Sequence, residues 1–129
     1  MNISQLTGKR IFVIGNGGSY ANACHIVNDL LLKGIAAFTL DAASLTCSAN
    51  DFGYDTVFER WLKVVARPSD VLIALSGSGK SPNIVNACAW AEANGLEVIR
   101  RFGMPGGLTM QEAEEEQLMW MHDLCFPKN

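Results

Sequence analysis

The chain has 129 residues, a formal net charge of −3 at pH 7 and an apolar fraction of 49%, which predicts one globular domain with its own core. The slightly acidic balance and the absence of a lysine or arginine cluster exclude nucleic acid as the expected partner. No apolar run approaches the roughly 20 residues of a membrane span. Residues 1–10 also lack the apolar core of a secretion signal, so we expect a soluble, cytoplasmic protein with no membrane partner.

Four apolar runs predict strands, and most of them are continuous, as is typical of strands covered on both faces. The expected strands are Arg10 to Ile14, Ala36 to Leu40, Asp70 to Leu75 and Glu97 to Phe102. Helical patterns follow each strand, from Ser19 to about Lys33, Asp55 to Ala66, Pro82 to Asn94 and Thr109 to about Cys125. Thr109 and Glu112 match a capping box, and Ser81 is the expected N-cap of the third helix.

This alternation of strand and helix predicts the fold class. Parallel strands joined by helices require right-handed crossovers, which place helices on both faces of the sheet. We therefore expect an α/β fold, a doubly wound parallel sheet of four to five strands. In such a sheet a ligand binds beyond the carboxyl ends of the strands.

The cysteines do not suggest a metal centre or a disulfide framework. They are Cys24, Cys47, Cys88 and Cys125, widely separated and without a Cys-x-x-Cys pair. We expect reduced, mostly buried thiols.

Two loops rich in glycine and serine each follow a predicted strand and precede a predicted helix. The first reads Gly-Asn-Gly-Gly-Ser over residues 15–19, and the second reads Ser-Gly-Ser-Gly-Lys-Ser-Pro over residues 76–82. Glycine lets the backbone approach an anion closely, and the first N–H groups of a helix are unpaired donors. Serine hydroxyls can complete the contacts with a phosphate monoester. The expected hydroxyl donors are Ser19, Ser76, Ser78 and Ser81.

Two other phosphate motifs fit these loops less well. A dinucleotide fingerprint needs Gly-x-Gly-x-x-Gly and an acidic ribose partner, for which Asp41 is the candidate. A Walker loop needs a glycine five residues before Gly79, where Ala74 stands. The serines could also act only as turn and cap residues, a role that Ser81 has in either case.

Three segments together resemble the sugar isomerase (SIS) domain, in particular its phosphoheptose isomerase branch. They are residues 15–19, residues 49–55 with the sequence Ala-Asn-Asp-Phe-Gly-Tyr-Asp, and residues 76–83, within a resemblance that extends from Lys9 to about Ile99. It implies a single flavodoxin-like SIS domain over residues 1–129 that binds a phosphorylated sugar at a subunit interface, in a homodimer or homotetramer. It also implies isomerisation of a ketose to an aldose through an enediolate, on a sugar phosphate such as sedoheptulose 7-phosphate. The substrate-binding residues that it implies are Asn16, Gly17, Gly18, Ser19, Asn50, Asp51, Ser76, Gly77, Ser78 and Ser81.

An isomerase of this kind needs a base beside the carbon alpha to the carbonyl and an acid for the developing oxyanion. His25 and Asp29 lie four residues apart, so they share one face of the first predicted helix. By the resemblance, Asp29 stands where the family has a glutamate base, which is one methylene longer, and His122 matches the histidine acid of the closing helix. The reaction requires no cofactor. The resemblance nevertheless implies zinc in some members, for which His25, Asp29, Glu114 and His122 would be the ligands here.

The chain resembles an abridged member of the family. Met1 to Gly8 is too short for the long first helix of the family, and residues 103–108 leave little room for its usual fifth strand. The shorter base and the shortened fold keep a second hypothesis open. This is a non-catalytic SIS domain that binds a phosphosugar or a protein partner as a sensor or adaptor.

Overall fold

The computed structural model describes residues 1–128 and has a parallel sheet at its centre. The strands are β1 Arg10–Ile14, β2 Ala36–Phe38, β3 Val71–Leu75 and β4 Glu97–Arg101, in the spatial order β2-β1-β3-β4. The register pairs Ile14 with Ala74, so the carboxyl ends of β1 and β3 lie level. The predicted parallel sheet is therefore confirmed, with four strands in the described part of the chain.

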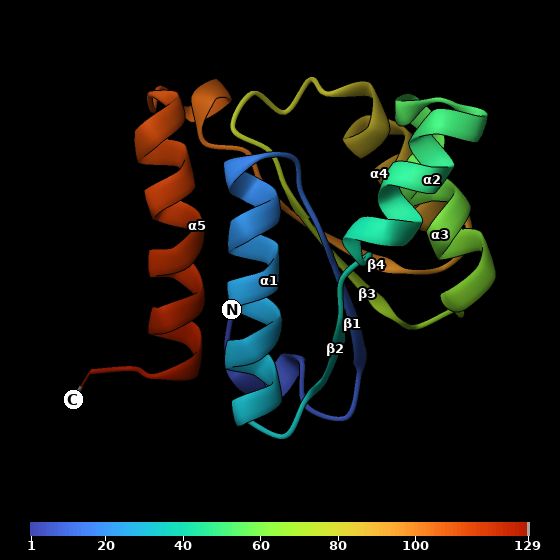
Figure 1. Ribbon diagram of the computed structural model, residues 1–129. Coiled ribbons are helices and arrows are strands. Elements are labelled where there is room, and N and C mark those ends of the chain that lie inside the picture. The colour runs from blue at the N-terminus through green and yellow to red at the C-terminus, as the bar shows by residue number, and fades with distance from the viewer. Residues whose placement is uncertain (129) are drawn as a thin grey trace.

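Helices cover both faces of this sheet, as predicted. They are α1 Gly18–Leu32, α2 Ala42–Phe52, α3 Val57–Val65, α4 Pro82–Ala93 and α5 Met110–Cys125. In Figure 1, α1 and α5 stand side by side on one face, while α2, α3 and α4 gather on the other. Successive side chains of β1 alternate between two apolar clusters: Ile11 and Val13 pack with α1 and α5, and Phe12 and Ile14 pack with α3 and α4. None of the described helices combines the length and the apolar character that crossing a membrane requires.

The helix α2 is the element that the sequence pattern does not predict. None of its residues is fully buried, and its contact with the core is limited to residues such as Leu45 and Ala49, which are partly buried, so the sequence shows no long apolar stripe. Asp41, the residue considered as a ribose partner, is instead its N-cap and accepts a hydrogen bond from the backbone N–H of Ser44 at 3.1 Å. The strand β2 is also shorter than predicted, because it ends at Phe38 rather than Leu40.

The remaining helix boundaries follow the predicted capping residues closely. Ser81 is the N-cap of α4, and the capping box of α5 forms between Thr109 and Glu112. α3 begins after the short 3₁₀ turn η2 Tyr54–Thr56, rather than at Asp55. Two further 3₁₀ turns are η1 Ile3–Gln5 and η3 Met104–Gly106.

All four cysteines are free thiols. Cys88 and Cys125 are buried, whereas Cys24 and Cys47 are exposed, so the expectation of mostly buried thiols holds for only half of them. Burial raises the pKa of the Cys88 thiol, as it does that of Cys125.

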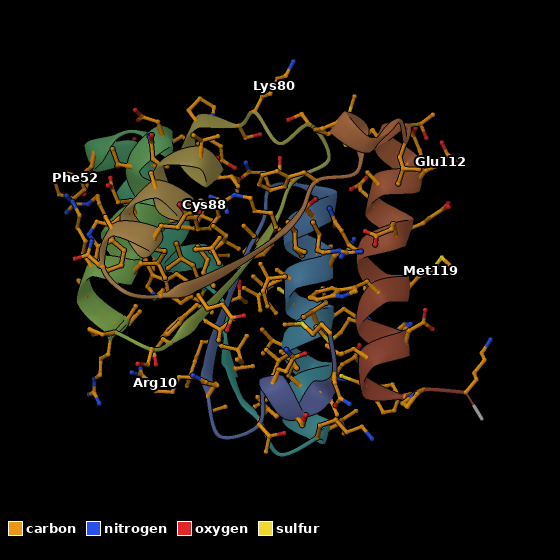
Figure 2. The ribbon with its side chains drawn as sticks, turned by 180° about the vertical axis from the view of Figure 1, so that it is seen from behind. Arg10, Phe52, Lys80, Cys88, Glu112 and Met119 are labelled. Carbon is orange, nitrogen blue, oxygen red and sulfur yellow. The ribbon has the colours of Figure 1, made fainter. Side chains whose placement is uncertain are left out.

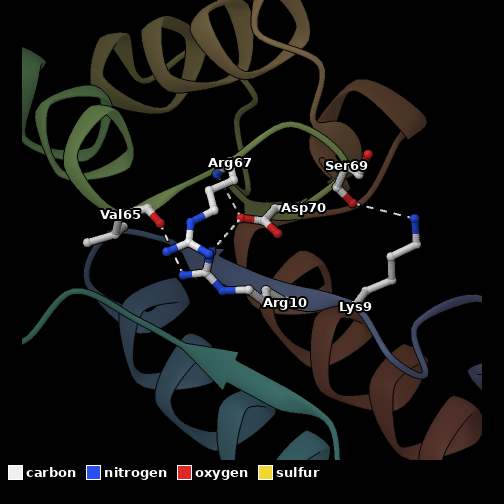
Figure 3. Close-up of polar contacts among 6 residues, drawn as sticks. All are labelled: Lys9, Arg10, Val65, Arg67, Ser69 and Asp70. Atoms are coloured by element: carbon white, nitrogen blue, oxygen red, sulfur yellow. Dashed lines mark hydrogen bonds and ion pairs between the residues drawn. The ribbon is translucent and has the colours of Figure 1, made fainter.

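The amino ends of β1 and β3 are joined by a polar network around Asp70 (Figure 3). The Arg10 guanidinium lies 3.2 Å from the Asp70 carboxylate and also donates to the carbonyl of Val65 at 3.1 Å. The backbone N–H of Arg67 donates to the same carboxylate at 2.8 Å. Asp70 is buried, and these donors compensate the cost of removing its charge from water.

Candidate functional site

The two predicted loops meet at the carboxyl end of the sheet, where they line one cavity of about 270 Å³. β1 and β3 are neighbours in the sheet, so the loops that follow them come together although they are far apart in the sequence. The lining residues are Asn16, Gly18, Ser19, Leu75, Ser76, Gly77, Ser78, Ser81, Met110 and Glu114. The cavity therefore holds all four serines that the sequence singles out as hydroxyl donors.

The serines of the second loop shape the turn and keep a proton to donate. Ser76 Oγ accepts a hydrogen bond from the Gly79 N–H at 3.0 Å, and Ser78 Oγ accepts one from the Lys80 N–H at 3.1 Å. A hydroxyl that accepts in this way still has its own O–H to give. Ser81 caps α4 without a side-chain hydrogen bond to the helix. Ser76 and Ser78 therefore do stabilise the turn, but their hydroxyl protons remain available to a ligand.

Ser19 is held by a buried network between α1 and α5. Gln117 Nε2 donates to Ser19 Oγ at 3.1 Å, and Asn22 Nδ2 donates to Gln117 Oε1 at 2.9 Å. Gln117 is fully buried. Because Ser19 accepts from Gln117, its own hydroxyl proton is left to point elsewhere. Sequence reasoning missed Gln117, although a glutamine one turn from buried Ala113 and Met121 was a usable signal.

Asn16 ties the first loop to the opposite side of the site. Its amide and the amide of Asn83 exchange two hydrogen bonds of 2.9 Å, and the hydroxyl of Tyr54 donates to Asn16 Oδ1 at 2.6 Å. Neither partner was predicted. These contacts fix the first loop against α4 and η2, so the two loops form one unit.

Two glycines of the first loop are required for different reasons, one for its backbone conformation and one for a close contact. Gly17 has a φ of 56°, in the region that favours glycine, and it begins α1 without a side-chain cap. At Gly18 a Cβ atom would overlap the carboxylate of Glu114, which leans against the first turn of α1. The predicted close approach to the backbone is therefore made, in this structure, by an acidic side chain of the protein.

Asn50 and Asp51 are not brought to the serine cavity. They stand at the end of α2 with exposed side chains, where Asn50 Nδ2 donates to Asp51 Oδ1 at 3.1 Å. Asp51 also lies 3.5 Å from the thiol of Cys47. Their expected role in substrate binding therefore has no support within a single copy of the chain. The physical reason is α2, the helix that the sequence pattern did not reveal.

A second group of chemistry-bearing residues lies between α1 and α5. His122 Nε2 is 3.3 Å from Asp29 Oδ2, His25 Nε2 is 3.6 Å from the same oxygen, and the two imidazole Nε2 atoms are 3.1 Å apart. Asp29 is only 4% exposed, and its Oδ2 has no hydrogen-bond partner. The histidines are about half exposed. The predicted proton-transfer pair, Asp29 and His122, is thus in direct contact.

The same trio has the donor chemistry of a zinc site. One ligand atom from each of His25, Asp29 and His122 lies within 4.8 Å of the others. Two imidazole nitrogens and a carboxylate oxygen are ligands that zinc accepts, and the exposure of the histidines leaves room for a further ligand. Asp29 Oδ2 is buried and lies close to two imidazole nitrogens without a hydrogen bond to either, and this arrangement fits a bound cation.

Glu114 does not join this cluster, contrary to the expected ligand set. It precedes His122 by eight residues on α5, which is about 12 Å along the helix axis, too far to share one ion. Its carboxylate lines the serine cavity instead. The cluster is also distant from that cavity, because Asp29 follows Ser19 by ten residues, or about 15 Å, along α1.

Known proteins are similar to this chain in both sequence and structure. Residues 2–100 match the SIS domain. The phosphoheptose isomerase of Thiobacillus denitrificans is 40% identical over 93% of this chain and 63% of its own length, and that of Pectobacterium atrosepticum is 39% identical over 84% and 60%. The structure of phosphoheptose isomerase GmhA from Neisseria gonorrhoeae matches with a TM-score of 0.82 and 27% identity, over 94% of this chain and 77% of that one. A phosphoheptose isomerase structure from Francisella tularensis, at 24% identity and a TM-score of 0.81, supports the fold.

The chain spans less than two thirds of the length of these two sequence relatives. The SIS domain match nevertheless covers most of this chain and includes both loops of the serine cavity. The chain belongs to the SIS domain family.

Proposed function

We propose that the chain binds a sugar phosphate, with the phosphate group in the serine cavity. The observation that carries this proposal is the convergence of Ser19, Ser76, Ser78 and Ser81 on one cavity. The cavity lies at the amino ends of α1 and α4, where helix dipoles favour an anion. Similarity to phosphoheptose isomerases adds the substrate class, and sedoheptulose 7-phosphate is the ligand to test first.

The proposed reaction is the isomerisation of that ketose to an aldose. Asp29 takes a proton from the carbon next to the ketone, and His122 donates a proton to the carbonyl oxygen, which gives an enediol(ate) intermediate. Asp29 then returns its proton to the former carbonyl carbon, while the hydroxyl of the neighbouring carbon gives its proton back to His122 and becomes the aldehyde oxygen, which completes the aldose. Their contact of 3.3 Å lets the two side chains act as a coupled pair. Zinc held by His25, Asp29 and His122 would supply Lewis-acid polarisation of a substrate oxygen.

The distance between the two groups favours an active site shared by two copies of the chain. Asp29 is about 15 Å from Ser19 along α1, whereas a seven-carbon sugar phosphate is about 10 Å long with zigzag bonds of about 1.5 Å. A substrate anchored in the serine cavity therefore falls short of the Asp29 of the same copy. In a homodimer or homotetramer, a second copy would bring its own Asp29 and His122 to the substrate.

Binding is tested by calorimetry with sedoheptulose 7-phosphate. The double variant Ser76→Ala, Ser78→Ala should weaken binding by about 100-fold, because each lost hydrogen bond to a charged group is worth about 1.5 kcal/mol or more. Ser4→Ala with Ser48→Ala is the matched control, since it removes two hydroxyls that do not line the cavity. Equal affinities for the two double variants would refute the proposed phosphate position.

Catalysis is tested by deuterium incorporation into the ketose in D₂O. Asp29→Asn should lower the exchange rate by about 100-fold or more while sugar phosphate binding persists. Asp123→Asn, an exposed acidic position on α5, is the control. Mixing Asp29→Asn with the serine double variant should restore part of the exchange if the site is shared, because one mixed interface then combines an intact cavity with an intact Asp29.

The second candidate function is phosphosugar binding without catalysis, as a sensor or adaptor. It is favoured by Asp29, whose carboxylate is one methylene shorter than the glutamate base that the resemblance implies. An intact cavity that binds the sugar phosphate, together with no deuterium exchange by the unmodified protein between pH 6 and 9, would establish this function in place of the enzyme.

A further inference from the structure

The serine cavity contains an acidic side chain and no basic one. Glu114 is among its lining residues, and neither lysine nor arginine is. The nearest basic residue in the second loop, Lys80, is exposed and points away from the body of the protein (Figure 2). A site built for a phosphate dianion therefore carries a negative charge of its own.

Glu114 lies against the first turn of α1. Its backbone carbonyl accepts a hydrogen bond from Asn22 Nδ2 at 2.9 Å, which anchors this turn of α5 to α1. Its carboxylate lies so close to Gly18 that a Cβ atom there would overlap it. Gly17 gives α1 no side-chain cap, so the positive end of the helix dipole is open to an anion. The carboxylate stands where that end of the helix would hold a phosphate.

We propose that Glu114 is an internal competitor of the phosphate and sets the affinity and charge preference of the cavity. This inference rests on the proposed phosphate site. A carboxylate and a phosphate cannot both occupy the first turn of α1 without strong repulsion. An incoming phosphate has to displace the Glu114 side chain, so the free protein binds dianions more weakly than its serines and helix termini would otherwise allow. The affinity for a singly charged ligand is reduced less, because its repulsion by the carboxylate is weaker.

The test is calorimetry at pH 8 and constant ionic strength, with inorganic phosphate and the monoanion methyl sulfate as probes. Glu114→Gln keeps the shape of the side chain and removes its charge, and it should bind phosphate about tenfold more tightly. The gain for methyl sulfate should be smaller, about threefold, because the repulsion scales with ligand charge. Glu115→Gln is the matched control: it removes the same charge from an exposed neighbouring position and should change neither affinity by more than about twofold.

Glu114→Asp provides a second variant that keeps the charge. Its carboxylate is one methylene shorter and retracts from Gly18, so phosphate should bind more tightly than to the unmodified protein but less tightly than to Glu114→Gln. The inference is overturned, with the phosphate site intact, if Glu114→Gln gains nothing while Ser76→Ala, Ser78→Ala still loses affinity. It is also overturned if Glu115→Gln gains as much. If no form of the protein binds phosphate or sugar phosphate, both the inference and the proposed function fall.

Discussion

At the amino end of β1 and β3, a buried carboxylate is paired with donors of the protein, whereas the serines at the carboxyl end of β3 keep a hydroxyl proton that they can donate. Asp70 is buried and receives donors from Arg10 and Arg67 (Figure 3). Ser76 and Ser78 receive one backbone donor each and retain their own hydroxyl protons. The polar groups at the amino end therefore stabilise the fold, whereas those at the carboxyl end are available to a ligand.

This difference separates stability from binding within one small fold. A buried polar group with all its partners contributes to the free energy of unfolding, and losing one partner costs the desolvation of the other. A group with a donor to spare contributes little to stability but can meet a ligand. Substitutions at the two ends should therefore affect different measurements.

The largest expected effect on stability comes from Asp70→Ala at the amino end. It leaves the half-buried Arg10 without its anionic partner and the N–H of Arg67 without an acceptor. We expect a loss of about 2 to 3 kcal/mol in the free energy of unfolding, measured with urea, and no change in sugar phosphate affinity. Asp51→Ala, at an exposed position, is the control and should cost less than about 0.5 kcal/mol. A loss of sugar phosphate binding in folded Asp70→Ala would mean that the two ends are not separate.

The substitution Gln117→Leu tests whether one buried side chain contributes to both stability and phosphate binding. Gln117 is buried like Asp70 but bonds to Ser19, a residue of the cavity. Leucine has a similar size and no amide, so the Ser19 and Asn22 groups lose a partner, and we expect a cost of about 1 to 2 kcal/mol in urea unfolding. Ser19 is then free to turn its proton away from the cavity, and phosphate affinity should fall by about fivefold, the equivalent of about 1 kcal/mol. Unchanged affinity would show that Gln117 serves the α1–α5 packing alone.

The capping box of α5 gives a smaller effect with a defined pH dependence. Thr109→Ala should cost about 1 kcal/mol, the usual value of an N-cap. The backbone and side-chain hydrogen bonds with Thr109 hold the pKa of Glu112 below its usual value of 4.5. The stability from Glu112 is therefore fully present above pH 4.5 and is lost as the pH falls through the lower pKa of the folded state. Urea titrations at pH 7 and pH 3 should show a smaller difference between wild type and Thr109→Ala at pH 3; an equal difference would exclude this contribution.

The fold was predictable where local chemistry determines it. Apolar runs, most of them continuous, identified the four strands, and Ser81 and the Thr109 capping box marked the starts of α4 and α5 because they act within one helical turn. The helix α2 escaped notice because none of its residues is fully buried, and two partly buried apolar residues, Leu45 and Ala49, are too few to give a clear periodic pattern.

The candidate site was predictable in its loops but not in the residues that support them. The serines lie in two short segments, whereas the contact of Gln117 with Ser19 joins positions 98 apart in the chain, and that of Asn16 with Asn83 joins positions 67 apart. Nothing in the sequence alone pairs such residues. Glu114 was assigned to the metal cluster by its place in the chain, but the rise of α5 carries it to the serine cavity instead.

Ser78→Ala is the substitution expected to change stability least, although it lies at the edge of the sheet that would bind the ligand. Ser78→Ala removes a hydroxyl that accepts one hydrogen bond, from the Lys80 N–H, in a loop at the surface. Water can replace that acceptor, so urea unfolding should change by less than about 0.5 kcal/mol. Sugar phosphate affinity should nevertheless fall by about tenfold, since the lost donor would face a charged oxygen. Asp70→Ala should show the reverse pattern, a loss of stability with unchanged sugar phosphate affinity. Each variant would then change one measured quantity and leave the other unchanged. A stability loss from Ser78→Ala as large as that from Asp70→Ala, with affinity preserved, would mean that the serine loop exists to fold the protein rather than to hold a ligand.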